Sequence, residues 1–272
     1  MKKIATIICF LISINFLAKA DSLSVHPGIY YTYGNYSSDA SSKAFSVYVP
    51  FVFGQRHTFL AGYDNLKIIT PNWDYNQQMY NLQTILNFDP FYIKLNYDYI
   101  NGDYLESNSI NNYQDRTNIF NLESFIRLKL FYIGLSYVHL KMNGGILQQS
   151  TDQFTARLEY LIDPRVYLSL KPSYVKVKDG RNLASFEARI NYLPLNSFLI
   201  KAGAMFGKRA YYFDSDLLTI FNQEETQDKK YFGQVEYTPV KSFTFILSYI
   251  HSGFETYSIN YFVAGIKAHL GS

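Results

Sequence analysis

The chain has 272 residues, of which 48% are hydrophobic and 18% aromatic, with 26 Tyr and 22 Phe. Its formal net charge of +3 comes from 25 basic and 22 acidic residues, and three of the lysines lie within the first twenty residues (Lys2, Lys3 and Lys19). Without these three, basic and acidic residues balance, so net charge gives no basis for binding nucleic acid or an anionic surface. We expect no nucleic-acid partner.

The first twenty residues have the pattern of an export signal. Met1-Lys2-Lys3 is a charged start, residues 4–17 form an apolar run, and residues 18–20 (AKA) are a small-residue cleavage motif. The run is too short for a membrane-spanning helix. Cys9, the only cysteine, lies within it. We therefore expect a signal peptide over 1–20 and one exported domain over 21–272, held together without disulfides.

From residue 23 onward, apolar and polar residues alternate with period two, which is typical of β-strands. In residues 87–100 (NFDPFYIKLNYDYI), every second residue from Phe91 onward is apolar or aromatic, while Lys94 and Asp98 lie in the row between. The pattern predicts about fourteen strands, at 23–34, 43–53, 57–65, 77–88, 91–101, 117–129, 131–141, 151–162, 166–177, 183–193, 197–207, 230–239, 242–253 and 257–270.

The predicted connections alternate between short and long. Short ones lie at 54–56, 89–90, around Leu130, 163–165, 194–196 and 240–241. The longer ones are notably 66–76, 102–116 and 208–229. Five strands begin with a similar turn followed by alternating apolar residues, and their starts are 33 to 45 residues apart. This spacing predicts a series of long β-hairpins.

Period-two alternation places the two rows of side chains on opposite faces of a strand. In a soluble exported β-protein the apolar row faces a core, whereas in a membrane barrel it faces lipid and the polar row faces a wet interior. Charged residues keep to one row in strand after strand, and most strands are about ten residues long, which favours the membrane barrel. Because open sheet edges cannot exist in hydrocarbon, such a sheet must close on itself.

Short turns on one side and longer polar loops on the other resemble the bacterial outer-membrane β-barrel (porin-like) proteins, over the whole of 21–272. The resemblance implies an all-β, closed antiparallel up-and-down transmembrane barrel of about 14 strands, within a range of 12–16. It implies short periplasmic turns, longer extracellular loops and location in the outer membrane, with membrane lipid and the assembly machinery as partners. The last strand departs from the pattern because it ends in Leu-Gly-Ser and not in an aromatic residue.

On this assignment the polar row lines the interior. The residues predicted to line a pore are Lys94, Asn96, Asp98, Glu123, Arg127, Lys129, Arg157, Glu159, Lys171, Glu187, Arg189, Lys201, Glu236 and Lys267. Pairing across strands accounts for most of the charges. They also suit a solute path in which the small excess of bases favours anions. A barrel of about fourteen strands is wide enough to leave some lumen.

Segment 208–229 is the longest predicted loop, and it contains an apolar piece, residues 217–221. Two arrangements are open. The segment extends its two flanking strands beyond the membrane, or it folds inward as a constriction.

No residue pattern indicates an enzyme. His251, Ser252 and Glu255 lie together, as do His and Ser in outer-membrane lipid hydrolases, but the adjacent His251 and Ser252 fall on opposite faces. His139 has no acid two residues away. The histidines form no spaced metal cluster, and nucleotide motifs are absent from the sequence. We expect neither catalysis nor a metal or other cofactor.

The function expected from the sequence is a passive channel for small polar solutes. The alternatives are a loop-mediated binding or structural surface protein with a plugged barrel and, more distantly, an outer-membrane lipid hydrolase. The sequence leaves the solute and the oligomeric state open.

Overall fold

A computed structural model describes residues 22–54, 56–106, 112–144, 148–214, 216, 219–221 and 225–271. The predicted signal peptide lies outside the described residues. Within them, no helix is long and apolar enough to cross a membrane. The strands are β1 (Leu23–Val25), β2 (Gly28–Tyr36), β3 (Ser41–Phe53), β4 (His57–Ile69), β5 (Trp73–Phe88), β6 (Phe91–Glu106), β7 (Asn112–Leu128), β8 (Phe131–Gly144), β9 (Gln148–Asp163), β10 (Val166–Val177), β11 (Asn182–Leu195), β12 (Phe198–Arg209), β13 (Tyr212–Asp214), β14 (Thr219–Phe221), β15 (Gln227–Val240), β16 (Phe243–Phe254) and β17 (Ser258–Ala268).

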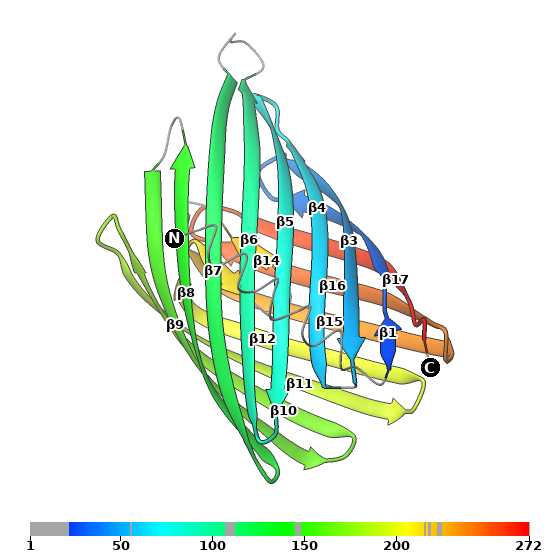
Figure 1. Ribbon diagram of the computed structural model, residues 1–272. Coiled ribbons are helices and arrows are strands. Elements are labelled where there is room, and N and C mark those ends of the chain that lie inside the picture. Colours follow the sequence, from blue (N-terminus) through cyan, green and yellow to red (C-terminus); the bar gives the residue numbers. More distant parts are fainter. Residues whose placement is uncertain are drawn as a thin grey trace.

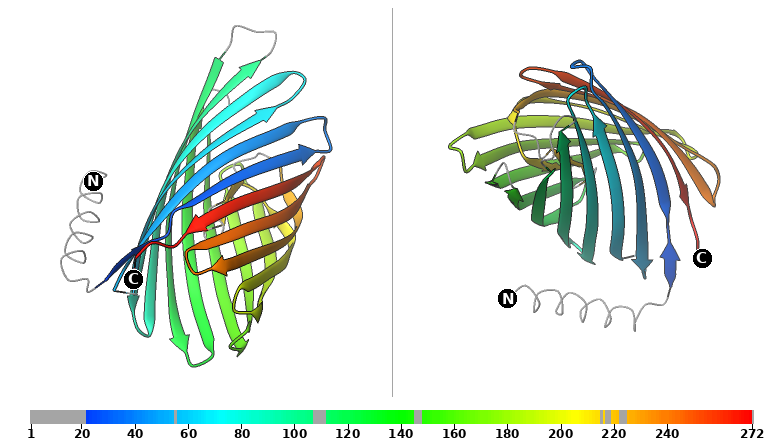
Figure 2. Two further views of the ribbon diagram at one scale, coloured as in Figure 1. Left: turned by 90° about the vertical axis from the view of Figure 1, so that its right-hand side faces the viewer. Right: turned by 90° about the horizontal axis from the view of Figure 1, so that it is seen from above.

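The strands form one closed antiparallel wall (Figure 1). Neighbours in the chain pair with each other from β2 to β12 and from β15 to β17, and β12 pairs with β15. The last strand, β17, pairs with β2 and closes the wall, so that red and blue strands lie side by side in Figure 2. β1 and β2 both pair with β3, so they act as one wall strand interrupted at His26 and Pro27. The predicted barrel of fourteen strands is confirmed.

The two rims of the barrel differ. At one rim, here called the turn end, the wall strands are joined by short connections such as 89–90, 129–130 and 164–165. At the other, the loop end, β12 and β15 are joined by residues 210–226. The expected loop 66–76 shrinks to 70–72, and β6 and β7 extend into the expected loop 102–116 as far as Glu106 and Asn112, because the polar residues there continue the strand ladders. Backbone hydrogen bonds between strands form in polar segments as well as in apolar ones. Polarity alone therefore makes the predicted strands too short on both sides of these loops.

The wall strands expose their apolar row and bury their polar row. Leu135 on β8 is 68% exposed, whereas Lys94 on β6 is 6% exposed. Aromatic rings of neighbouring strands stack on the outward face near the turn end, as in Phe131 with Tyr160 (ring centroids 4.7 Å apart) and Phe198 with Tyr237 (4.5 Å). Such rings collect at membrane boundaries. The outward face therefore has the chemistry of a lipid-facing surface.

The interior of the barrel changes character along its axis. Toward the loop end the inward row turns apolar, and these side chains form a buried cluster that includes Ile100, Ile119, Leu140, Val175 and Ile259. Deeper inside, the same strands present amides and charges. The first and last described residues lie at the turn end, where Val25 and Leu270 exchange backbone hydrogen bonds of 2.7 and 2.8 Å.

Candidate functional site

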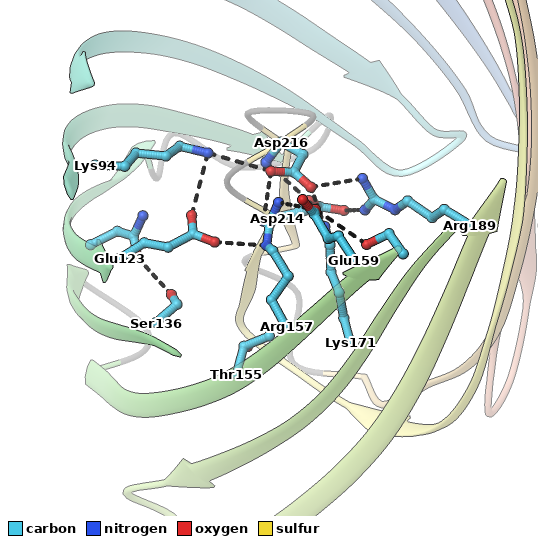
Figure 3. A network of polar contacts seen from close by, with 12 residues as sticks. Lys94, Glu123, Ser136, Thr155, Arg157, Glu159, Lys171, Arg189, Asp214 and Asp216 are labelled. Atoms are coloured by element: carbon cyan, nitrogen blue, oxygen red, sulfur yellow. Dashed lines mark hydrogen bonds and ion pairs between the residues drawn. The ribbon is translucent and has the colours of Figure 1, made fainter. Parts of the chain in front are cut away.

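The described residues of segment 210–226 fold into the barrel (Figure 3). β13 and β14 form a separate two-stranded sheet that pairs with no wall strand. β12 ends at Arg209 and β15 begins at Gln227, so the segment does not extend these strands. We call residues 210–214, 216 and 219–221 the inserted hairpin. Of the two arrangements open from the sequence, the inward one is observed; the apolar residues 217 and 218 lie outside the described residues.

The first half of the hairpin is fixed to the wall through its backbone. Gln153 of β9 donates from Nε2 to the Phe213 carbonyl and accepts from the Phe213 N–H, each over 3.0 Å. Thr151 donates to the Tyr211 carbonyl over 3.3 Å. Side chains of the wall thus satisfy backbone groups of a segment that has no ladder with the wall.

Burial of aromatic rings adds to this attachment. Tyr211, Tyr212 and Phe213 are almost fully buried and pack in the apolar cluster near the loop end. The guanidinium of Arg209 lies 4.2 Å from the ring centre of Tyr212. Full burial of a ring the size of Phe stabilises by about 1.5–3 kcal/mol. The root of the hairpin is therefore firmly packed.

The tip of the hairpin carries two carboxylates into a group of cations (Figure 3). Asp216 accepts from Arg157 Nη2 over 2.7 Å and from Arg189 Nη1 over 3.1 Å. Its carboxylate also contacts Lys171, and Lys94 Nζ lies 3.4 Å away. Four cations from four wall strands thus meet one carboxylate.

Asp214 lies beside Asp216 and shares some of its partners. Arg189 donates to it through Nη2, while Lys230 Nζ lies 3.4 Å and Lys171 Nζ 3.9 Å away. Arg189 therefore binds one hairpin carboxylate with each of its terminal nitrogens. Arg189 thus bridges the two carboxylates through charge-assisted hydrogen bonds, which are stronger than hydrogen bonds between neutral groups.

Three glutamates on the wall complete the group. Glu123 lies 2.8 Å from Arg157 Nε, and Glu159 accepts from Arg157 Nη1 over 2.9 Å. Glu187 pairs with Arg189 and lies 3.6 Å from both other cations nearby, Arg209 and Lys230. We call the whole set the central charge cluster, whose members are Lys94, Glu123, Arg157, Glu159, Lys171, Glu187, Arg189, Arg209, Lys230, Asp214 and Asp216.

The charges of the cluster fix the ionisation of the hairpin. Burial by itself would raise the pKa of Asp214 and of Asp216, but the nearby cations outweigh it and hold both pKa values well below the usual range. For Asp214 the strongest contributor is Arg189, and for Asp216 it is Lys171. Both carboxylates are therefore charged at neutral pH.

A second group of charges lies nearer the turn end. Glu236 on β15 pairs with Lys201 on β12 at 2.5 Å and with Lys267 on β17 at 3.4 Å. The two lysine side chains are 32% and 31% exposed. We call these three residues the turn-end cluster. Its ion pairs and hydrogen bonds involve no described residue of the hairpin.

The other predicted interior residues divide between an amide cluster and the rim. Asn96 accepts from Gln83 (3.3 Å) and Asn121 (3.2 Å), and Asp98 accepts from Asn81. These side chains are buried inside the wall.

Arg127 and Lys129 do not join the interior clusters. Arg127 pairs over 2.9 Å with Asp89 of the neighbouring turn, and Lys129 lies exposed in its own turn. Whether a residue occupies an odd or an even position in a strand gives the face on which its side chain lies. Its distance from the rim decides whether that face is enclosed by the barrel.

Four members of the central cluster were not predicted from the sequence. Arg209, Asp214 and Asp216 fall within the segment assigned as a loop, and Lys230 opens the strand after it. The available signal was local: the aromatic run 211–213 precedes two acids, and three consecutive aromatic residues are unusual in a solvated loop.

The geometry gives no nucleophile and base pair at the histidines considered earlier. His251 Nδ1 lies 2.9 Å from Asn260 Oδ1, while the Ser252 side chain is fully buried on the opposite face. His139 has an acid after all, Asp152 of β9 at 2.9 Å, which also accepts from Tyr137. Among the described residues, no group of three or more His, Cys, Asp or Glu is arranged to hold a metal ion.

Comparison with known proteins shows similarity in structure only. No family model matches the chain, and no curated protein matches its sequence. Among solved structures, the deltaS2 mutant of the TodX monoaromatic hydrocarbon channel has a TM-score of 0.60 at 10% identity, covering 93% of this chain and 90% of that one. The toluene transporter TodX of P. putida gives 0.50 at 10% identity, over 93% and 89%.

CdiB from Acinetobacter baumannii gives a TM-score of 0.54 at 9% identity, over 91% of this chain and 60% of CdiB. The chain has the fold of outer-membrane β-barrels. At these identities the comparison concerns the arrangement of strands, and the residues of the central charge cluster have to be interpreted from their own chemistry.

Proposed function

We propose that this protein is an outer-membrane channel for small polar solutes, with its turn end in the periplasm, and that the inserted hairpin holds it closed in the conformation described. The observation that carries the proposal is the central charge cluster. A fourteen-stranded wall is wide enough to enclose a lumen, and here charged side chains of the wall meet a segment that is not part of it.

The way in which the hairpin is attached supports a removable closure. It shares no β-ladder with the wall, so its withdrawal would leave every wall pairing intact. Its described contacts with the wall are side-chain hydrogen bonds, ion pairs and ring packing. After withdrawal, amides and charges on the inner face would replace part of the hydration shell of a polar solute. One protein with this fold, TodX, is a monoaromatic hydrocarbon channel.

Conductance in planar bilayers tests the proposal. In one variant, residues 211–221 are replaced by a short Gly-Ser linker; in the control, the linker replaces residues 37–40, another loop-end connection. We expect the first variant to conduct several-fold more than the wild type and the control to match the wild type. If the correctly folded 211–221 variant stays silent, the channel function is excluded.

The burial of Tyr211, Tyr212 and Phe213 favours a second candidate, a permanently plugged barrel that acts as a binding or structural surface protein. Rings packed in an apolar cluster resist withdrawal. A wild type that stays silent at every voltage while the 211–221 variant conducts would make this candidate the leading one.

A further inference from the structure

We propose that the central charge cluster is a binding site for small dicarboxylates, and that Asp214 and Asp216 occupy this site as a built-in surrogate of the solute. The inference rests on the proposed channel function only for its transport role, because binding can be measured without conduction. It names the class of solute that the barrel interior would bind, and it explains why the hairpin lies inside the barrel.

The first argument is charge. The wall contributes six cations to the cluster (Lys94, Arg157, Lys171, Arg189, Arg209 and Lys230) and three glutamates. The two hairpin carboxylates offset two of the three excess positive charges. Buried cations without partners are strongly destabilising. Whatever replaces the hairpin tip must therefore be anionic.

The second argument is geometry. The two oxygens of Asp216 have different partners: Oδ1 accepts from Arg157, and Oδ2 accepts from Arg189 and Lys171. A free carboxylate has the same planar group and can make the same contacts. Asp214 sits next to it, joined through the shared Arg189 and Lys171. Two adjacent carboxylate positions on common cations suit one small molecule with two carboxylates.

The third argument is access. The Asp216 side chain is 24% exposed, whereas that of Asp214 is 2% exposed and the rings of 211–213 are buried. A solute carboxylate can therefore displace the tip while the root stays packed. A tethered group competes at an effective concentration of about millimolar. The wild type should consequently bind free dicarboxylates weakly, and removal of the hairpin charges should uncover the site.

The test is equilibrium dialysis of radiolabelled succinate against the refolded protein in detergent. Asp214→Asn with Asp216→Asn keeps the size of both side chains and removes their charge. We expect this variant to bind succinate about tenfold more tightly than the wild type, since the tethered competitor is gone. Neutral succinamide should not compete. The control, Asp89→Asn, removes the exposed carboxylate paired with Arg127 and should bind as the wild type does.

Two further variants keep the test decisive. If the double variant does not assemble, as judged by heat-modifiable gel mobility, Asp216→Asn alone replaces it, because Asp216 is the more accessible carboxylate. Adding Lys171→Met to either variant should abolish the gain, since Lys171 contacts both carboxylate positions. Succinate binding no tighter than that of the wild type in a folded variant overturns the proposal. Binding without conductance would keep this site and remove the channel function; conductance without binding would do the reverse.

Discussion

The central charge cluster and the turn-end cluster lie on the same inner face of the same barrel, yet the cations of the first are largely buried and those of the second are partly exposed. In the central cluster, Arg157 and Lys171 are about as buried as core residues. In the turn-end cluster, Lys201 and Lys267 keep almost a third of their side-chain surface exposed. Both have more cations than acids on the wall. The inserted hairpin makes the difference, because it brings two carboxylates into contact with the cations of the central cluster.

The two clusters illustrate two ways in which the barrel accommodates charged side chains in its interior. Attraction between charges is strong where water is excluded, but so is the penalty for leaving one charge without a partner. Where water remains, pairs contribute little and are screened by salt. Two clusters of similar composition should therefore respond very differently to the same change.

The largest effect is expected from removing one cation in each cluster. Arg157→Met leaves Glu123 and Asp216 short of a buried partner and should lower the free energy of unfolding by about 3–5 kcal/mol. Lys201→Met should lower it by about 1 kcal/mol or less. Urea unfolding of the refolded proteins in lipid bilayers measures both. Equal losses would mean that burial does not distinguish the clusters.

The contrast between the two clusters holds only if both lie on the inner face of the barrel wall. Leu95 lies on the outward row next to Lys94, so Leu95→Arg should cost about 2–4 kcal/mol at the bilayer midplane and less nearer a boundary. Lys94→Leu should cost less, because Glu123 and Asp216 keep Arg157 as partner. Yields of heat-modifiable, membrane-inserted protein rank the two. A more harmful lysine change would invert the assignment of faces.

A smaller effect is expected at the root of the hairpin. Gln153→Ala removes both hydrogen bonds to the backbone of Phe213 and should destabilise the inserted position by about 1–3 kcal/mol. Amide hydrogen exchange of residues 211–214 should then accelerate. Gln149→Ala is the matched control, since Gln149 on the same strand bonds Asp179 and not the hairpin. Unchanged exchange at 211–214 would show that Gln153 does not hold the hairpin.

The smallest effect concerns pH. The pKa values of Asp214 and Asp216 are depressed in the folded state, so their contribution is fully present above the unfolded carboxylate value of about 3.9 and is lost as pH falls through the folded values. Exchange of the hairpin amides, corrected for intrinsic rates, should stay constant from pH 7 to about pH 4 and rise only below. A rise near pH 6 would contradict charged, paired carboxylates.

The sequence predicted the wall well because period-two alternation is a local property that survives in every strand. It located residues such as Lys94 and Leu95 on opposite faces without knowledge of their neighbours. It also placed Lys201, Glu236 and Lys267 in one row. Their pairing depends on which strands are adjacent and in what register, which alternation does not encode.

The inserted hairpin could not be derived in this way. A loop has no periodicity, and its position depends on contacts with residues far away in the chain, such as Gln153 with Phe213. The two carboxylates at its tip acquire their role only through cations on other strands. Alternation is also silent on how far along the barrel axis a residue lies, so it cannot separate Arg127 and Lys129 at the rim from residues of the interior.

The exchange of backbone hydrogen bonds between Val25 and Leu270 makes the barrel suitable for circular permutation. Both described ends of the chain lie at the turn end, and the position a Gly271 side chain would take is within 3 Å of the Leu23 backbone. A short linker from residue 271 to residue 22 would thus replace a break that the fold already spans. New ends opened within 107–111, between β6 and β7, would leave every wall pairing in place. The first strand to be synthesised would then be β7, and Lys94 on β6 would emerge after the hairpin instead of before it.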